Sequence, residues 1–246
     1  MRLLVSVANA ADASAALSGG ADVIDAKNPV AGALGAVSAE AFRDVYTTVA
    51  GRRLVTAAIG DATEEAAIER TASAFAAAGA ALVKVGFAGI TAARRIDALI
   101  RAAVRGARTG AADAYSTCGV VAVAYADEER VGSLAAGALV GIAARAGAAG
   151  VLLDTADKSG PGLPGLITPS ALAQWVAGAH EAGLLVALAG KLTAEDFAFV
   201  RCTGADIAGV RGAACDSGRA GHVSSEKVAL LRAWCRPAEA GHYVRR

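Results

Sequence analysis

The sequence predicts an α/β protein that folds as a single (β/α)8 barrel. Short apolar segments alternate with longer Ala-rich segments that have helical spacing, and small-residue sequences containing Gly come just before several of the apolar segments. A Gly at a helix end adopts the left-handed conformation and turns the chain back toward a sheet. Repeated units of this kind, joined by right-handed crossovers, give a parallel α/β fold.

Eight strands are predicted from the apolar segments. Most are continuous runs of Val, Ile, Leu and Ala without alternation, which is typical of parallel strands that are covered on both faces. Eight strand–helix units in 246 residues fit the size of a (β/α)8 barrel. The predicted strands are 3–7, 22–27, 54–59, 82–87, 119–124, 150–154, 184–189 and 206–210.

A doubly wound open sheet is the alternative fold. It is less well supported, because no GxGxxG sequence follows the first predicted strand. No linker, low-complexity segment or block of charge divides the chain. We therefore expect one domain over residues 1–246, with residues 235–246 as a peripheral tail.

Composition and charge argue against several classes of protein. The net charge of +1 gives no electrostatic reason to expect nucleic acid or an acidic membrane as a partner. No apolar run approaches the ~20 residues that span a bilayer, and the first residues lack the long apolar region of a signal peptide. Four Cys without CxxC spacing and three His do not indicate a metal site. We expect a cytoplasmic, metal-free protein without a cofactor; a homo-oligomer is left open, since the sequence does not determine the oligomeric state.

Lysine is rare in this chain and its positions are informative. Only five of the 24 basic residues are Lys, and four of these lie in or just after apolar segments: Lys27, Lys84, Lys158 and Lys191. A buried Lys can lose its proton, whereas Arg cannot. Because a neutral amine attacks carbonyl groups, this pattern indicates a lysine-dependent site that acts on a carbonyl compound.

The predicted barrel brings these residues to one end. Active sites of such barrels lie at the carboxyl ends of the strands. Lys27 ends the second predicted strand, Lys84 lies within the fourth, Asp154 ends the sixth and Lys158 follows it. Asp25 lies two residues before Lys27 and shares its face of the strand, so we expect these two side chains to pair. A single strand-end Lys is more often a salt-bridged or solvent-reaching residue, but the convergence of several favours catalysis.

A phosphate site is predicted in the loops after the seventh and eighth strands, where barrels of this kind often bind phosphate. The first of these loops contains Gly190 and Lys191, and the second contains Arg211 and Gly212. The glycines leave backbone N–H groups accessible, and Lys191 or Arg211 could supply the charge.

Several segments together resemble the (5-formylfuran-3-yl)methyl phosphate synthases of methanofuran biosynthesis, also called 4-(hydroxymethyl)-2-furancarboxaldehyde-phosphate synthases. The resemblance runs from residue 3 to about residue 215, and the IDAKNP, VKVGF and DTADKSG segments are its most specific parts. The other matching segments are LLVSV, TAAIGD, VAVAYAD, GLLVALAGKL and DIAGVRGAAC.

The resemblance implies a barrel with a metal-free mechanism like that of class I aldolases. It implies that two molecules of glyceraldehyde 3-phosphate are condensed and cyclised to a furan aldehyde phosphate, with loss of phosphate and water. It places the family's functional residues on Lys27, Lys84, Asp154 and Lys158. Lys191 departs from the family pattern, which has a small residue there, and we expect phosphate binding from it at most.

Lys27 is the first candidate for the Schiff base, and Lys84 is the alternative because the middle of an apolar strand is more desolvated. Asp154 is the predicted acid/base, oriented by Lys158. Two rival functions remain. One is another phosphosugar barrel enzyme, such as an aldolase, decarboxylase or epimerase, that uses Asp154, Asp157 and Lys158 without an imine. The other is a catalytically silent sugar-phosphate-binding protein.

Overall fold

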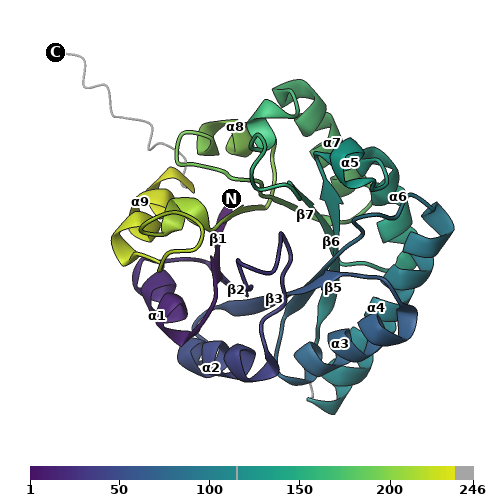
Figure 1. Ribbon diagram of the computed structural model, residues 1–246, viewed down its shortest axis with the longest axis horizontal. Coiled ribbons are helices and arrows are strands. Elements are labelled where there is room, and N and C mark those ends of the chain that lie inside the picture. Colours follow the sequence, from purple (N-terminus) through teal and green to yellow (C-terminus); the bar gives the residue numbers. More distant parts are fainter. Residues whose placement is uncertain (115, 236–246) are drawn as a thin grey trace.

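Eight parallel strands close into a barrel that is surrounded by helices (Figure 1). The computed structural model describes residues 1–114 and 116–235. Each strand lies within two residues of its predicted bounds, so the predicted fold class is confirmed. The strands are β1 (Arg2–Val7), β2 (Val23–Ala26), β3 (Leu54–Asp61), β4 (Leu82–Gly86), β5 (Gly119–Tyr125), β6 (Gly150–Asp154), β7 (Leu185–Leu188) and β8 (Ile207–Val210).

Closure of the sheet excludes the alternative open fold. β1 pairs with β2 on one side and with β8 on the other, and the second pairing begins with Arg2 opposite Ile207. The α-helices in the described residues are α1 (Ala10–Ser18), α2 (Ala39–Val49), α3 (Glu65–Ala77), α4 (Ala93–Asp113), α5 (Glu128–Val131), α6 (Ala136–Ala146), α7 (Pro169–Glu181), α8 (Phe197–Cys202) and α9 (Ser225–Cys235). Short 3-10 turns lie at Leu163–Gly165 and Gly212–Ala214.

The local signals for chain reversal act as predicted. Each of the Gly-containing sequences before β2, β4, β6, β7 and β8 holds one Gly with positive φ, for example Gly79 at 102° and Gly147 at 83°. At the opposite helix ends, the side chains of Asn9, Ser38 and Thr168 accept backbone N–H groups and cap α1, α2 and α7. Helix ends and strand starts are therefore set by nearby residues.

Apolar side chains form two layers, one between the strands and the helices and one inside the barrel. The inner layer fills the amino end of the barrel, with contributions from Leu4, Val23, Val121, Leu152 and Ile207. Closer to the carboxyl ends, the inward-facing positions become polar. This change along the barrel axis leaves the carboxyl end as the place for chemistry.

The carboxyl end is filled on the side of β3 and β5. Leu34, from the loop after β2, and Tyr125 at the end of β5 are both almost fully buried in the inner layer. The Tyr125 hydroxyl donates to Asp61 Oδ1 at 2.7 Å. There is no room beside them for a side chain at Gly86, since an added Cβ would collide with Tyr125 and Asp61. The remaining space lies toward β6, β7, β8 and β1.

The predicted tail is only partly described. Cys235, its first residue, is buried at the end of α9, and residues 236–246 lie outside the described part of the chain. Within the described residues, none of the helices combines the length and the apolar character that crossing a membrane requires.

Substitution of two helical glycines should change stability in opposite directions. Gly110 of α4 lies against the backbone of Ser73 in α3, so Gly110→Ala should lower the free energy of unfolding by about 1–3 kcal/mol through overpacking. Gly178 of α7 has no atom within 4 Å of an added Cβ, so Gly178→Ala should stabilise by up to about 1 kcal/mol through helix propensity. Urea unfolding with comparison of midpoints and slopes measures both. Equal stability of the two variants would contradict the close α3–α4 packing.

Candidate active site

A cavity of about 440 Å³ opens at the carboxyl end of the barrel, within the size range of small-molecule sites. None of its lining residues comes from β3 or β5, in agreement with the filling of that side. Eight of the nine predicted site residues line the cavity: Lys27, Lys84, Asp154, Lys158, Gly190, Lys191, Arg211 and Gly212. Asp25 is the ninth, and its fully buried side chain does not reach the cavity wall.

Asp25 anchors a buried polar cluster that spans four neighbouring strands. Its Oδ2 accepts the Ser6 hydroxyl of β1 at 3.0 Å, and its Oδ1 accepts the Thr56 hydroxyl of β3 at 2.7 Å. Lys84 of β4 forms an ion pair with the same Oδ1. A buried charge needs partners of this kind because its desolvation is costly. Lys84 is therefore fixed in place by the barrel wall.

The expected pair between Asp25 and Lys27 is not formed, and this prediction is corrected. Asp25 lies in β2 and Lys27 directly follows this strand, two residues later. The Asp25 carboxylate, however, is occupied by Lys84 and two hydroxyls. The cause is the neighbouring strand, which places Lys84 close enough to take the carboxylate. Spacing along one strand could not reveal this competition.

Lys27 is left as a buried amine without a direct partner. The residue is 8% exposed, and among the described residues its Nζ has no hydrogen-bond or ion-pair partner. The pKa of Lys27 is lowered to about 8, chiefly by burial; the Asp154 and Asp25 carboxylates oppose this shift, and the Lys84 and Lys158 ammoniums add to it. A substantial neutral fraction near neutral pH makes this amine suitable as a nucleophile.

Asp154 and Lys158 form a second, oriented ion pair. Lys158 Nζ donates to Asp154 Oδ1 at 2.7 Å, and its other contacts are the carbonyl and the hydroxyl of Thr155. These three acceptors saturate the ammonium. Burial by itself would raise the pKa of Asp154, but the Lys158 and Lys27 ammoniums together with hydrogen bonds to the carboxylate lower it.

The two oxygens of Asp154 differ in their surroundings. Oδ1 accepts both Lys158 Nζ and the Thr155 N–H, which lies 2.8 Å away. Within the described residues, Oδ2 receives no hydrogen bond from the protein. This oxygen is consequently the one that can exchange a proton with a ligand in the cavity.

Gly190 and Lys191 turn the loop after β7 into the cavity wall. Both have positive φ, 106° and 57°, and a side chain at Gly190 would come within 3.1 Å of Thr155 and Leu163. A non-Gly residue in this conformation is strained and often marks a functional site. The Lys191 ammonium donates to the Gly160 carbonyl at 2.5 Å and has no carboxylate partner among the described residues.

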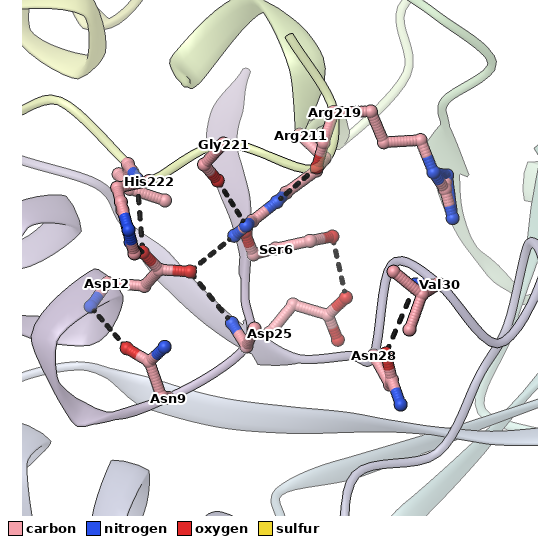
Figure 2. A network of polar contacts seen from close by, with 12 residues as sticks. Ser6, Asn9, Asp12, Asp25, Asn28, Val30, Arg211, Arg219, Gly221 and His222 are labelled. Carbon is pink, nitrogen blue, oxygen red and sulfur yellow. Dashed lines mark hydrogen bonds and ion pairs between the residues drawn. The ribbon is translucent and has the colours of Figure 1, made fainter. Parts of the chain in front are cut away.

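Arg211 lines the cavity, but its guanidinium is already committed to the protein (Figure 2). It forms an ion pair with Asp12 at 2.6 Å and donates to the carbonyls of Ser6, Arg219 and Gly221. Four of its five N–H donors are used in this way. Its environment therefore favours a structural role, tying β1 to the loop after β8.

Arg219 is a cavity residue that sequence reasoning missed. Its side chain extends away from the Arg211 cluster (Figure 2) and lines the cavity. Within the described part of the chain it makes one hydrogen bond, to the Gly32 carbonyl at 2.6 Å. Burial lowers the pKa of its guanidinium, and the Asp154 carboxylate opposes this shift. The only signal in the sequence was its place in the Gly-rich segment after β8, a long loop whose path spacing alone does not fix.

The cavity carries an excess of positive charge. Lys84, Lys158 and Arg211 are paired with Asp25, Asp154 and Asp12, respectively. Three more lining cations, Lys27, Lys191 and Arg219, have no carboxylate partner in the part of the chain that the structure describes. An unpaired set of cations in a cleft favours an anionic ligand. In the same described residues, no group of three His, Cys, Asp or Glu side chains is placed to hold a metal ion.

Solved structures with this architecture confirm the fold. A 3-hexulose-6-phosphate synthase superposes with a TM-score of 0.60 at 22% identity, covering 95% of this chain and 99% of that chain. A phosphoribosyl anthranilate isomerase from Thermus thermophilus gives a TM-score of 0.60 at 16% identity, covering 95% and 98%. At these identities the similarity concerns the barrel alone.

Sequence comparisons are more specific. The chain is 40% identical over 218 residues to the (5-formylfuran-3-yl)methyl phosphate synthase of Methanopyrus kandleri, covering 88% of this chain and 90% of that protein. It is 36% identical over 239 residues to the protein of the same name from Methanocaldococcus jannaschii, covering 96% and 100%. The family model described as 4-HFC-P synthase matches residues 3–232. The chain therefore belongs to the 4-HFC-P synthase family.

Proposed function

We propose that this protein is a (5-formylfuran-3-yl)methyl phosphate synthase that condenses two molecules of glyceraldehyde 3-phosphate, with loss of inorganic phosphate and water. The observation that carries the proposal is Lys27, a buried and unpartnered amine with a pKa of about 8 that faces a cavity with excess positive charge. Such a site suits a substrate with a carbonyl group and a phosphate group. The relatives named as (5-formylfuran-3-yl)methyl phosphate synthases support the synthase role.

The proposed reaction begins at Lys27. The neutral amine attacks the aldehyde of one triose phosphate and forms an imine, which acidifies the adjacent C–H. Loss of that proton allows elimination of phosphate from the neighbouring carbon. The second triose phosphate isomerises to its ketose form, and the enamine-type carbon of the first adds to the C2 carbonyl of this ketose, because only that position gives a 3,5-substituted furan. Ring closure, loss of two waters and hydrolysis of the imine then release the aromatic furan and return the free Lys27 amine.

Asp154 is the proposed acid/base. Its Oδ1 is held by Lys158 and by a backbone N–H, which leaves Oδ2, within the described residues, as the free oxygen of a carboxylate that lines the cavity. A lowered pKa keeps this carboxylate ionised and able to accept a proton from the imine. The saturated ammonium of Lys158 acts as its orienting partner.

Phosphate binding is assigned to the unpaired cations at the cavity wall. Lys191 and Arg219 bring charge from the loops after β7 and β8, and Gly190 and Gly212 bring the backbone close. Arg211 contributes by holding its loop, since its donors are largely used. Lys84 lines the cavity beside Lys27 and is placed to polarise a carbonyl or contact a phosphate.

Lys27 is preferred to Lys84 as the Schiff base because Lys84 is paired with Asp25. This ion pair holds the Lys84 amine against a carboxylate inside the barrel wall, whereas the Lys27 amine has no such partner among the described residues. The rival phosphosugar enzymes would need no imine, and a silent binding protein would release no phosphate. Imine trapping therefore distinguishes the proposed enzyme from the first alternative, and phosphate release distinguishes it from the second.

Substitution of Lys27 by Arg should abolish turnover while preserving the fold. Arginine keeps the positive charge but cannot form an imine, so phosphate release and furan aldehyde formation should fall by at least about 10³-fold. Mass spectrometry after borohydride reduction should detect the reduced substrate adduct on Lys27 in the unmodified protein only. Circular dichroism controls for folding, and Lys227→Arg on α9 is the matched control.

Near-normal turnover in a folded Lys27→Arg protein would move the Schiff base to Lys84. If Lys84→Arg were equally active, the imine mechanism would be wrong. An imine without phosphate release would favour another aldolase-like reaction. Absence of both imine and turnover in the unmodified protein would favour the silent binding protein.

The rate of imine formation should rise with pH through a midpoint of about 8. The pKa is lowered, so the reactive neutral form of Lys27 appears well below the ordinary value of 10.5. At pH 7 roughly a tenth of the amine is neutral, and the rate should fall about tenfold for each further pH unit below that. Initial rates of borohydride trapping at different pH values measure this. A midpoint near 10.5 would show that the amine is not perturbed.

Removal of the Arg219 side chain should weaken substrate binding. Hydrogen bonds to charged groups contribute about 1.5–3 kcal/mol, so Arg219→Ala should raise KM for glyceraldehyde 3-phosphate by about 10–100-fold. Imine trapping at saturating substrate should survive. Arg53→Ala is the control, since Arg53 donates to the Ala21 carbonyl at the amino end of the barrel. An unchanged KM in Arg219→Ala would remove Arg219 from the phosphate site.

A further inference from the structure

Asp127 is a buried carboxylate outside the cavity wall. It follows β5 at the start of α5 and is 7% exposed. Its Oδ1 accepts the N–H of Ala156 at 2.8 Å, and its Oδ2 accepts the N–H of Asp157 at 2.7 Å. Both oxygens therefore hold successive backbone amides of the loop after β6, about thirty residues further along the chain. Such bonds to an ionised acceptor are short and strong.

The residue after these two amides is Lys158. Its side chain turns back over the same loop to reach Asp154 Oδ1, the Thr155 carbonyl and the Thr155 hydroxyl. This return path depends on the direction in which the backbone leaves Asp157. By fixing the peptide planes just before Lys158, Asp127 sets where the ammonium lies and hence how the Asp154 carboxylate is turned.

The contacts of the Asp157 side chain are weaker than those of Asp127. Asp157 forms an ion pair with Arg130 at 2.6 Å, but the Arg130 side chain is 61% exposed, and surface ion pairs contribute little. Asp157 Oδ1 also accepts the N–H and hydroxyl of Ser159, which are contacts within the loop itself. Of these contacts, the two from Asp127 are the buried, charged ones that connect the loop to another strand end.

We infer that Asp127 is a positioning residue that holds the Asp154–Lys158 pair in its working geometry. It acts through the backbone of Ala156 and Asp157, and it touches neither the cavity nor the proposed imine. The inference builds on the proposed function, because it assigns the held pair to proton transfer.

Two substitutions of Asp127 remove these contacts to different extents. Asp127→Ala removes both acceptors, while Asp127→Asn keeps one oxygen and presents an NH2 group where the second amide needs an acceptor. A small displacement of a catalytic group costs about 100-fold in rate, so kcat should fall about 100-fold in Asp127→Ala and by less in Asp127→Asn. KM should stay within about twofold, and borohydride should still trap an imine on Lys27, because the substrate site is untouched.

A double-mutant cycle shows whether Asp127 acts through Lys158. In a Lys158→Ala background the oriented pair is already lost, so adding Asp127→Ala should cost less than about twofold more in single-turnover rate. Equal losses in both backgrounds would overturn the inference, as would normal kcat in Asp127→Ala. A rise in KM as large as the fall in kcat would also overturn it, because the substitution would then act on substrate binding.

Asp206→Asn is the matched control for general loss of stability. Asp206 Oδ2 accepts the Val186 N–H at 2.8 Å, but at the amino end of the barrel. This variant should lose stability without losing kcat. If it lost kcat as strongly as Asp127→Ala, the effect would be unspecific and the inference would be wrong.

Hydrogen exchange provides a readout that does not depend on catalysis. In Asp127→Ala the amides of Ala156 and Asp157 should exchange at least tenfold faster, while those of β2 stay protected. Unchanged exchange in this loop would refute the positioning role even if activity fell. If the unmodified protein formed no imine and released no phosphate, the proposed function would fail, and the role of Asp127 in holding the loop would be judged by exchange alone.

Discussion

The buried ion pair between Lys84 and Asp25 is the interaction on which the rest of the site depends. It places one carboxylate among Ser6, Thr56 and Lys84, and so connects the first four strands inside the barrel. Because this carboxylate is occupied, Lys27 has no partner of its own, and burial lowers its pKa to about 8. Removal of one member of a buried pair leaves an uncompensated charge. The pair therefore separates the roles of the two lysines, because Lys84 is held by a carboxylate and Lys27 is left as a candidate nucleophile.

The loops of the site are held by a shared device, a buried carboxylate that accepts backbone amides of a distant segment. Asp12 at the start of α1 accepts the Val223 N–H at 3.0 Å and the Ala8 N–H at 3.1 Å, and it pairs with Arg211. Asp127 does the same for the loop after β6. Each carboxylate satisfies groups that would otherwise be buried without partners. These contacts let Gly-rich loops present side chains in fixed positions.

Much of the architecture follows from local signals in the sequence. Helix ends are marked by residues such as Gly79 and Gly147, and the apolar runs between them give the strands to within two residues. The period of two along a strand and the rule that catalysis occurs at the carboxyl ends then bring Lys27, Lys84 and Asp154 to one cavity. These signals are local, so they predict the strands and the end of the barrel at which each residue lies without knowledge of which strands are neighbours.

The sequence by itself determined the barrel, the end that holds the cavity and eight of the residues that line the cavity. Only the tertiary structure decided which charges pair. Asp25 was expected to pair with Lys27 but pairs with Lys84, and Arg211, expected to bind phosphate, is largely occupied by Asp12 and backbone carbonyls. The positions of Arg219 and Asp127 depend on contacts between loops that are far apart in the chain, with the Gly32 carbonyl and the Ala156 N–H, respectively. The physical reason is that ion pairing depends on distances of a few ångströms between different strands and loops, which spacing along one segment does not contain.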